Sequence, residues 1–201
     1  MENNNISQQS IIDQKAKIGI SYIRCTYEIK DFNEIQIIND RSENYSNQEI
    51  ASKIKILNGD KKEELIFRKK FDKLGINTID FIIEEKLNNL SYLFYKCSSL
   101  KKVNFISFET SQVNKMRAMF VECFELEELD LSNFDTSNVT DMAFMFQDCR
   151  KLKEIKGIEN FNTVKTSIMY AMFEACFEFE YLDLSNFNTS NVTDMSLMFK
   201  N

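Results

Sequence analysis

A motif recurs along the second half of the chain at a nearly constant spacing. Residue pairs that end in phenylalanine lie at Leu93-Phe94, Met119-Phe120, Met145-Phe146, Met172-Phe173 and Met198-Phe199, with successive spacings of 26, 26, 27 and 26 residues. A cysteine follows three residues after each of the first four phenylalanines, at Cys97, Cys123, Cys149 and Cys176. Such a period is typical of proteins whose units stack on one another, because one unit has too little apolar surface to fold alone.

The units share an internal pattern. In the segment LDLSNFDTSNVTDM, from Leu129 to Met142, leucines alternate with polar residues, which predicts a short strand. The Ser, Asn and Thr residues that follow predict a corner. From Val139 to Cys149, apolar residues recur every three or four positions, which predicts a short helix. The unit around Gly157 carries one extra residue, which accounts for the spacing of 27.

From this pattern we predict an α/β solenoid, a right-handed stack of strand and short-helix coils. Residues 86–201 form four units of 26 or 27 residues with incomplete ends. Like residues of successive units then stack in the core, with the methionines and cysteines among them. The expected ring stacks are Phe134, Phe161 and Phe187, and Phe120, Phe146, Phe173 and Phe199.

The N-terminal part has no repeat. Residues 1–15 are polar and predicted to be a disordered tail. Several alternating segments in residues 16–85 predict short strands, and Asn58-Gly59 predicts a tight hairpin. We expect this part to be a small β-rich cap that shields the first unit.

The pattern L-x-x-L-D-L-S-x-F-x-T-S-N-V-T-D-M-x-x-M-F-x-x-C resembles the BspA-like leucine-rich-repeat surface proteins, which carry a 26-residue repeat of the mycoplasma-lipoprotein type. The resemblance covers Leu87 to Asn201. It implies a leucine-rich-repeat-like stack and an adhesive protein of the cell surface or a secreted one, from bacteria or protists, and it supplies no catalytic residues. The usage of Ile, Lys, Asn and Phe resembles that of AT-rich protist genomes. The N-terminal residues lack a signal-peptide pattern, which favours the cytoplasm, and the cell surface or secretion implied by the resemblance is the alternative location.

Composition excludes several classes of function. The chain has no histidine, the usual general base of hydrolases and a common metal ligand. Its four glycines are too far apart for a phosphate-binding loop. A net charge of -6 argues against non-specific nucleic-acid binding, and no stretch is apolar enough to insert into a membrane. We therefore expect no enzyme, no cofactor, no metal and no nucleic-acid partner. The cysteines lack C-x-x-C spacing and are predicted to be buried free thiols, with bridged or metal-binding thiols as the alternative.

The outward positions of the predicted strands are the candidate partner-binding residues, and the expected partner is a protein. They are Lys102, Asn104, Glu128, Asp130, Glu154, Lys156, Tyr181 and Asp183. Three alternatives remain open. Opposite charges in neighbouring units can simply stabilise the stack. The protein can be a scaffold or filament component that associates end to end through the last unit, at Val192, Met195, Met198 and Phe199. Paired carboxylates, among Asp130, Asp141, Asp183 and Asp194, can support hydrolysis without histidine.

Overall fold

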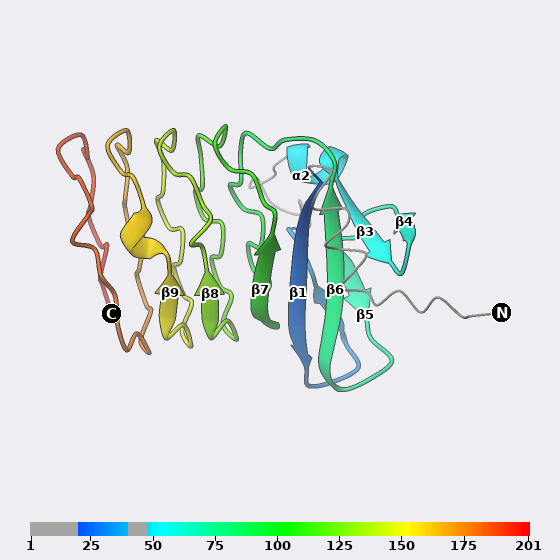
Figure 1. The fold of residues 1–201 in the computed structure, drawn as a ribbon. Coiled ribbons are helices and arrows are strands. Elements are labelled where there is room, and N and C mark those ends of the chain that lie inside the picture. The colour runs from blue at the N-terminus through cyan, green and yellow to red at the C-terminus, as the bar shows by residue number, and fades with distance from the viewer. Residues whose placement is uncertain (1–19, 40–47) are drawn as a thin grey trace.

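A computed structural model describes residues 20–39 and 48–201 of the chain, and Figure 1 shows its strands and coils side by side. The described elements are, in order, β1 (Ser21–Ile29), β2 (Glu34–Gln36), α2 (Gln48–Lys53), β3 (Ile54–Asn58), β4 (Lys61–Glu63), β5 (Arg68–Lys70), β6 (Gly75–Ile83), β7 (Leu100–Ile106), β8 (Glu128–Asp130), β9 (Glu154–Lys156) and the 3-10 helix η1 (Ile158–Asn160).

One sheet joins the N-terminal strands to the repeat strands. Its order is β4-β3-β6-β1-β7-β8-β9, and β2 and β5 form a separate pair. Strand β1 runs antiparallel to both β6 and β7, whereas β7, β8 and β9 are mutually parallel. Lys102 pairs with Glu128 and Glu128 with Glu154, so each repeat strand lies one 26-residue unit from the next.

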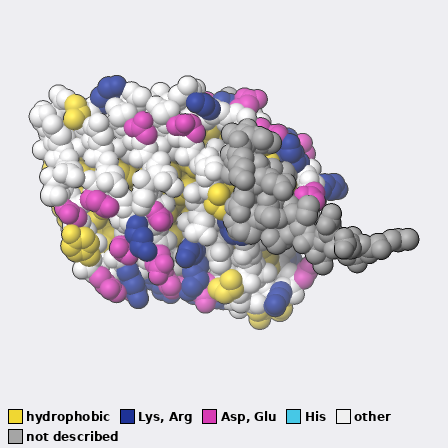
Figure 2. Space-filling view, viewed as in Figure 1, with side chains coloured by type: hydrophobic (Ala, Val, Ile, Leu, Met, Phe, Trp, Pro, Cys, Tyr) yellow, Lys and Arg dark blue, Asp and Glu magenta, His cyan; other side chains and the backbone are white. Residues whose placement is uncertain are grey.

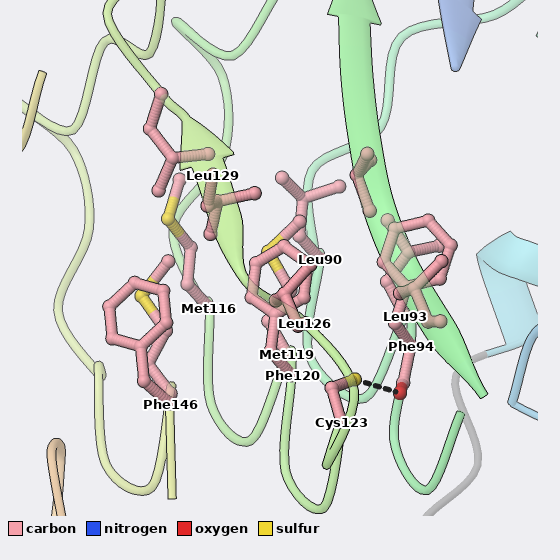
Figure 3. Close-up of a cluster of buried hydrophobic side chains, with 14 of the residues drawn as sticks. Leu90, Leu93, Phe94, Met116, Met119, Phe120, Cys123, Leu126, Leu129 and Phe146 are labelled. Atoms are coloured by element: carbon pink, nitrogen blue, oxygen red, sulfur yellow. Dashed lines mark hydrogen bonds between the residues drawn. The ribbon is translucent and has the colours of Figure 1, made fainter. Parts of the chain in front are cut away.

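The repeat units stack in register behind these strands. A second ladder of parallel bridges runs through Asn89, Lys115, Asp141, Ile168 and Asp194. The rings of Phe94, Phe120, Phe146, Phe173 and Phe199 stack in file, with successive centroids 5.5 to 5.9 Å apart. Figure 3 shows part of this core, in which leucines and methionines surround the rings. The ring stack predicted from Phe120 to Phe199 is confirmed.

The second predicted ring stack is only partly formed. The rings of Phe161 and Phe187 stack at 6.4 Å. The ring of Phe134 instead packs against the rings of Phe105 and Phe108, with centroid distances of 4.9 and 5.7 Å. The extra residue of the third unit lies between these two groups, because Lys156 still pairs with Asp130 while Phe161 follows Phe134 by 27 positions.

The predicted class, an α/β solenoid of strand and short-helix coils, is wrong. The described residues are predominantly strands and turns, and their one α-helix, α2, lies outside the repeats. The segments predicted as helices contain turns instead, and the repeat strands belong to a seven-stranded mixed sheet shared with the N-terminal strands. The structure is therefore a mainly β fold with stacked repeat turns.

Left-handed backbone conformations explain why the segments predicted as helices in the repeats form no helix. Within the segment predicted as a helix, Phe144 has a φ of 60° and Asp148 a φ of 57°, and equivalent residues of other units are also left-handed. A right-handed helix cannot pass through such residues. Each segment is instead two successive turns, closed by the N–H of Met145 donating to the Met142 carbonyl (3.2 Å) and that of Cys149 to Phe146 (3.1 Å). Other N–H groups donate to the next unit, as Phe146 does to Met172 at 3.0 Å.

Buried threonines hold the corners. The Thr136 hydroxyl donates to the carbonyl of Asn162 at 3.1 Å and accepts the N–H of the same residue at 2.8 Å. Thr110 and Thr163 make the same pair of bonds to the following unit. Because each of these hydroxyls satisfies a donor and an acceptor, the corners need no helix to pair their backbone groups.

The N-terminal part contains the strands expected from its alternating pattern. The hairpin at Asn58-Gly59 is confirmed, since Asn58 pairs with Lys61 and Gly59 has a φ of 60°. Strands β1 and β6 belong to the same sheet as the repeat strands β7, β8 and β9. The tail predicted at residues 1–15 lies outside the described residues.

Candidate protein-binding face

Most side chains that point away from the main core are polar, and they form a surface that we call the outer face. At one end of the sheet, Tyr22, Leu57 and Ile82 form a second, buried apolar cluster instead. Along β8 the burial pattern is exposed, buried, exposed, with Leu129 in the core and Glu128 and Asp130 outside. The same alternation on β1, β7 and β9 makes the surface continuous across the sheet. Figure 2 shows Lys, Arg, Asp and Glu side chains interspersed over the part of the molecule where β8 and β9 lie.

Six of the eight predicted binding residues lie together on the outer face. They line a shallow depression of about 100 Å³ over three strands, and they are Lys102, Asn104, Glu128, Asp130, Glu154 and Lys156. Tyr181 and Asp183 line an adjoining depression of about 460 Å³ with Glu154 and Lys156. Tyr181 and Asp183 are not in a strand. Next to them, the Glu180 N–H donates to the carbonyl of Lys153, the residue before β9, at 3.0 Å.

The charges of this depression are incompletely matched. The Lys102 ammonium lies 3.9 Å from the Glu128 carboxylate, at the limit of an ion pair. On its other side Glu128 pairs directly with Glu154, which places two like charges on neighbouring strands. Like charges in this position are unfavourable. The arrangement therefore favours an approaching cation.

Neighbouring columns of charge are matched more closely. Lys101 lies 2.7 Å from Glu127, and Lys151 lies 2.6 Å from Glu125. These pairs join successive units, as the alternative of purely stabilising charge ladders requires. The pairing is tight beside the depression and loose inside it.

The carboxylates proposed for hydrolysis cap turns. Asp130 accepts the N–H of Ser132 at 3.0 Å, and Asp183 accepts that of Ser185 at 2.9 Å. Hydrogen bonds from Ser132 lower the pKa of Asp130, and those from Ser185 lower the pKa of Asp183. Asp141 and Asp194 accept N–H groups in the same way. A general acid needs a raised pKa, so these shifts run against that role.

Sequence reasoning missed the N-terminal contribution to the outer face. Arg24 on β1 pairs with Asn104, and its guanidinium holds the Asp80 carboxylate through two bonds of 2.7 and 2.9 Å. Thr26 pairs with Lys102. No local signal in the sequence places β1 beside β7, because that pairing joins residues about 80 positions apart.

The cysteines are free and buried, as the sequence predicted. The thiol of Cys123 donates to the carbonyl of Phe94 at 3.2 Å, which Figure 3 marks. The thiols of Cys149 and Cys176 donate in the same way to the carbonyls of Phe120 and Phe146, at 3.1 and 3.0 Å. Within the described ranges, no three Cys, Asp or Glu side chains gather as a metal site would require. The thiol column therefore links one unit to the one before it.

The sheet, the stacked turns and the thiol column define a tandem-repeat protein with an exposed polar face. The chain matches the family model described as "Mycoplasma protein of unknown function, DUF285" over residues 66–157 and again over residues 130–201, and it belongs to that family. No curated protein and no solved structure matches the chain. Within residues 20–39 and 48–201, no helix is long and apolar enough to span a bilayer.

Proposed function

We propose that the protein is a non-enzymatic module that binds another protein through the outer face, centred on the depression over β7, β8 and β9. The observation that carries the proposal is the convergence of six polar side chains from three strands in that depression. A rigid sheet holds them at fixed spacing, which supports selective recognition of a partner surface.

The charge pattern gives the partner a chemistry. Glu128 and Glu154 lie side by side, and Lys156 pairs with Asp130 in the next row. A lysine or arginine from the partner would separate the two glutamates and relieve their repulsion. Adhesion to proteins of a host or matrix, as in the resembled surface proteins, is the most specific form of this function.

Capture of a partner tests the proposal. The whole chain, immobilised and exposed to extracellular-matrix and host-cell surface proteins, is expected to retain a discrete set of proteins. The double variant Glu128→Gln/Glu154→Gln should lose this set and unfold at a urea concentration no lower than the wild type, because both side chains lie outside the core and their like charges repel.

A matched control removes two exposed carboxylates elsewhere. The double variant Glu85→Gln/Glu178→Gln makes the same change in net charge outside the depression. It should retain the captured proteins. Equal retention by both double variants would show that binding depends on overall charge or on another surface, and it would contradict the proposal.

End-to-end association through the last unit remains a prediction of its own. Met195 and Phe199 are 43% and 55% exposed, whereas Met198 is buried. Light scattering over a range of protein concentrations tests it, since association must raise the apparent mass with concentration.

A further inference from the structure

A further depression lies on the outer face, next to the one over β7, β8 and β9. Its volume is about 290 Å³, and we call it the Ile76 depression. Figure 1 shows the strands that carry it, β6, β1, β7 and β8, side by side. The lining residues are Thr26, Ile76, Lys101, Lys102, Glu127 and Glu128. Because Lys102 and Glu128 also line the first depression, the two adjoin.

An exposed isoleucine makes the Ile76 depression apolar. The Ile76 side chain is 56% exposed, although most of the outer face is polar. In the sheet it lies diagonally next to Thr26, because Ile76 pairs with Glu28 and Thr26 pairs with Thr78. The methyl group of Thr26 therefore extends the apolar surface that Ile76 offers.

A β-bulge in β7 supplies one wall of the Ile76 depression. Thr26 pairs with Lys102, whereas Tyr27 pairs with Leu100, so Lys101 is an extra residue between the two pairs. A bulge re-aims a side chain of its strand, and here the consecutive residues Lys101 and Lys102 both line the depression. The methylene stems of the two lysines add to the apolar surface.

The charged groups around the Ile76 depression already have opposite partners. The Lys101 ammonium lies 2.7 Å from the Glu127 carboxylate and 3.8 Å from that of Glu28. The Lys102 ammonium lies 3.9 Å from the Glu128 carboxylate. A charged ligand would meet groups of both signs here, whereas an apolar side chain would cover Ile76 and leave these pairs intact. The depression therefore favours an apolar occupant.

One row of paired residues connects the Ile76 depression to the two glutamates of the proposed binding site. Thr26 pairs with Lys102, Lys102 with Glu128, and Glu128 with Glu154. Neighbouring strands lie about 4.8 Å apart, which places Thr26 about 12 Å from the midpoint between Glu128 and Glu154. In an extended chain, residues four positions apart point to the same side and lie about 13 Å apart. The two spacings match.

We propose that the outer face binds an extended segment of its protein partner in which an aliphatic residue and a lysine or arginine are four positions apart. The aliphatic side chain packs on Ile76 and Thr26, and the cation lies between Glu128 and Glu154. This inference rests on the proposed function, because it specifies the segment that the outer face binds.

Short peptides test the inference on the whole chain. The probes are acetyl-Leu-Thr-Ser-Thr-Lys-amide, the same peptide in reversed order, and versions of both with alanine for leucine or glutamine for lysine. NMR should show saturable shifts of the Ile76 methyl groups with one of the two orders. That peptide should bind at least about threefold more tightly than its alanine version, since leucine buries more apolar surface. Equal binding of the alanine version overturns the inference, as does the absence of Ile76 shifts at about 20 mM peptide, above the millimolar range of weak binding.

A matched pair of variants tests the role of Ile76. Ile76→Ala should remove the advantage of leucine over alanine and keep that of lysine over glutamine. Ile66→Ala is the control, because Ile66 is 45% exposed and lines neither depression. It should keep both preferences. An Ile76→Ala variant that still prefers leucine, at a urea midpoint like that of the wild type, contradicts the assignment.

A shorter spacing tests the row that joins the two sites. Acetyl-Leu-Thr-Ser-Lys-amide places the two side chains three positions apart, and it should bind no more tightly than the alanine version. Tighter binding of this peptide than of the five-residue peptide overturns the four-residue spacing.

The glutamine peptides separate failure of this inference from failure of the proposed function. If lysine binds more tightly than glutamine but leucine does not bind more tightly than alanine, the Ile76 site is wrong and the proposed function stands. If lysine has no advantage over glutamine, the cation site between Glu128 and Glu154 is wrong, and the inference falls with it.

Discussion

Replacement of Gly157 by alanine tests how closely two neighbouring units approach. A Cβ atom at this position would lie 2.3 Å from Ser132 Cα and 2.4 Å from Ser132 N, both backbone atoms of the preceding unit. Gly157 also has a φ of 84°. The extra residue of the third unit therefore fits only because it is glycine.

The free energy of unfolding that Gly157→Ala is expected to lose has two parts. A left-handed alanine costs about 1–2 kcal/mol, less about 0.4–1 kcal/mol gained through the unfolded chain. Forcing the backbones apart costs about 1–3 kcal/mol more. The variant Gly59→Ala is the matched control, because Gly59 also has a positive φ but nothing lies within 4 Å of its added Cβ. Only the first part applies to the control.

Urea unfolding followed by circular dichroism measures both variants. Gly157→Ala should be destabilised by about 3 kcal/mol and Gly59→Ala by about 1 kcal/mol or less. At about 2 kcal/mol per molar of urea, the midpoint of Gly157→Ala should fall by roughly 1.5 M. Equal midpoints for the two variants would refute the close approach of Gly157 to Ser132.

Three further predictions follow from the turns, corners and thiols. Ala175 has a φ of 57°, so Ala175→Gly should leave the free energy of unfolding unchanged or raise it by up to about 1 kcal/mol, whereas the same change in a helix would lower it by about 1 kcal/mol. Thr136→Val leaves the N–H and C=O of Asn162 without their partner and should cost about 1–3 kcal/mol in the same assay, while the exposed Thr140→Val should cost much less. Burial raises the pKa of the Cys123 and Cys149 thiols, and that of Cys176 to about 12. The folded protein then keeps protons that the unfolded chain releases above about pH 8.5, so stability is full below that pH and falls above it by up to about 1.4 kcal/mol per pH unit for each thiol. Urea midpoints at about pH 8 and pH 10 should show this fall, and a Cys149→Ala variant with an equally steep fall would contradict the assignment to the thiols.

The periodic residues predicted which side chains meet across units. The phenylalanines from Phe120 to Phe199 stack as expected, and the cysteines are buried free thiols. A constant spacing is sufficient for this, because stacked units place like residues beside like. The spacing does not specify the backbone conformation between those residues.

The helix prediction failed because the spacing of apolar residues does not distinguish a helix from two turns. Apolar residues at three- and four-residue intervals arise from a helix, but also from two consecutive turns that each point a residue inward. Ala118 and Glu122 adopt the left-handed region although neither residue type favours it. Neighbouring units impose it, since the N–H of Ala118 donates to Ala143 and that of Glu122 to Gln147, at 2.9 and 3.0 Å.

The alternation of polar and apolar residues predicted the candidate binding residues, but it did not predict which residues of β1 lie beside them. Glu128, Asp130 and the other outward residues of β7 to β9 lie together because the strands are in register. The contribution of Arg24 and Thr26 depends on the antiparallel pairing of β1 with β7. That pairing is decided by packing between distant segments, which a single sequence does not encode in any local pattern.

Disulfide trapping across β1 and β7 tests most directly whether the N-terminal strands and the repeats form one sheet. Thr26 and Lys102 are paired residues on the outer face, so cysteines at both positions fall within the Cα separation of about 4.4–6.8 Å that a disulfide spans. Under mild oxidation, the whole chain carrying Thr26→Cys/Lys102→Cys should form this bond rapidly, and Thr26→Cys/Glu128→Cys, one strand further away, should not. Equal rates in the two variants would contradict the continuous sheet.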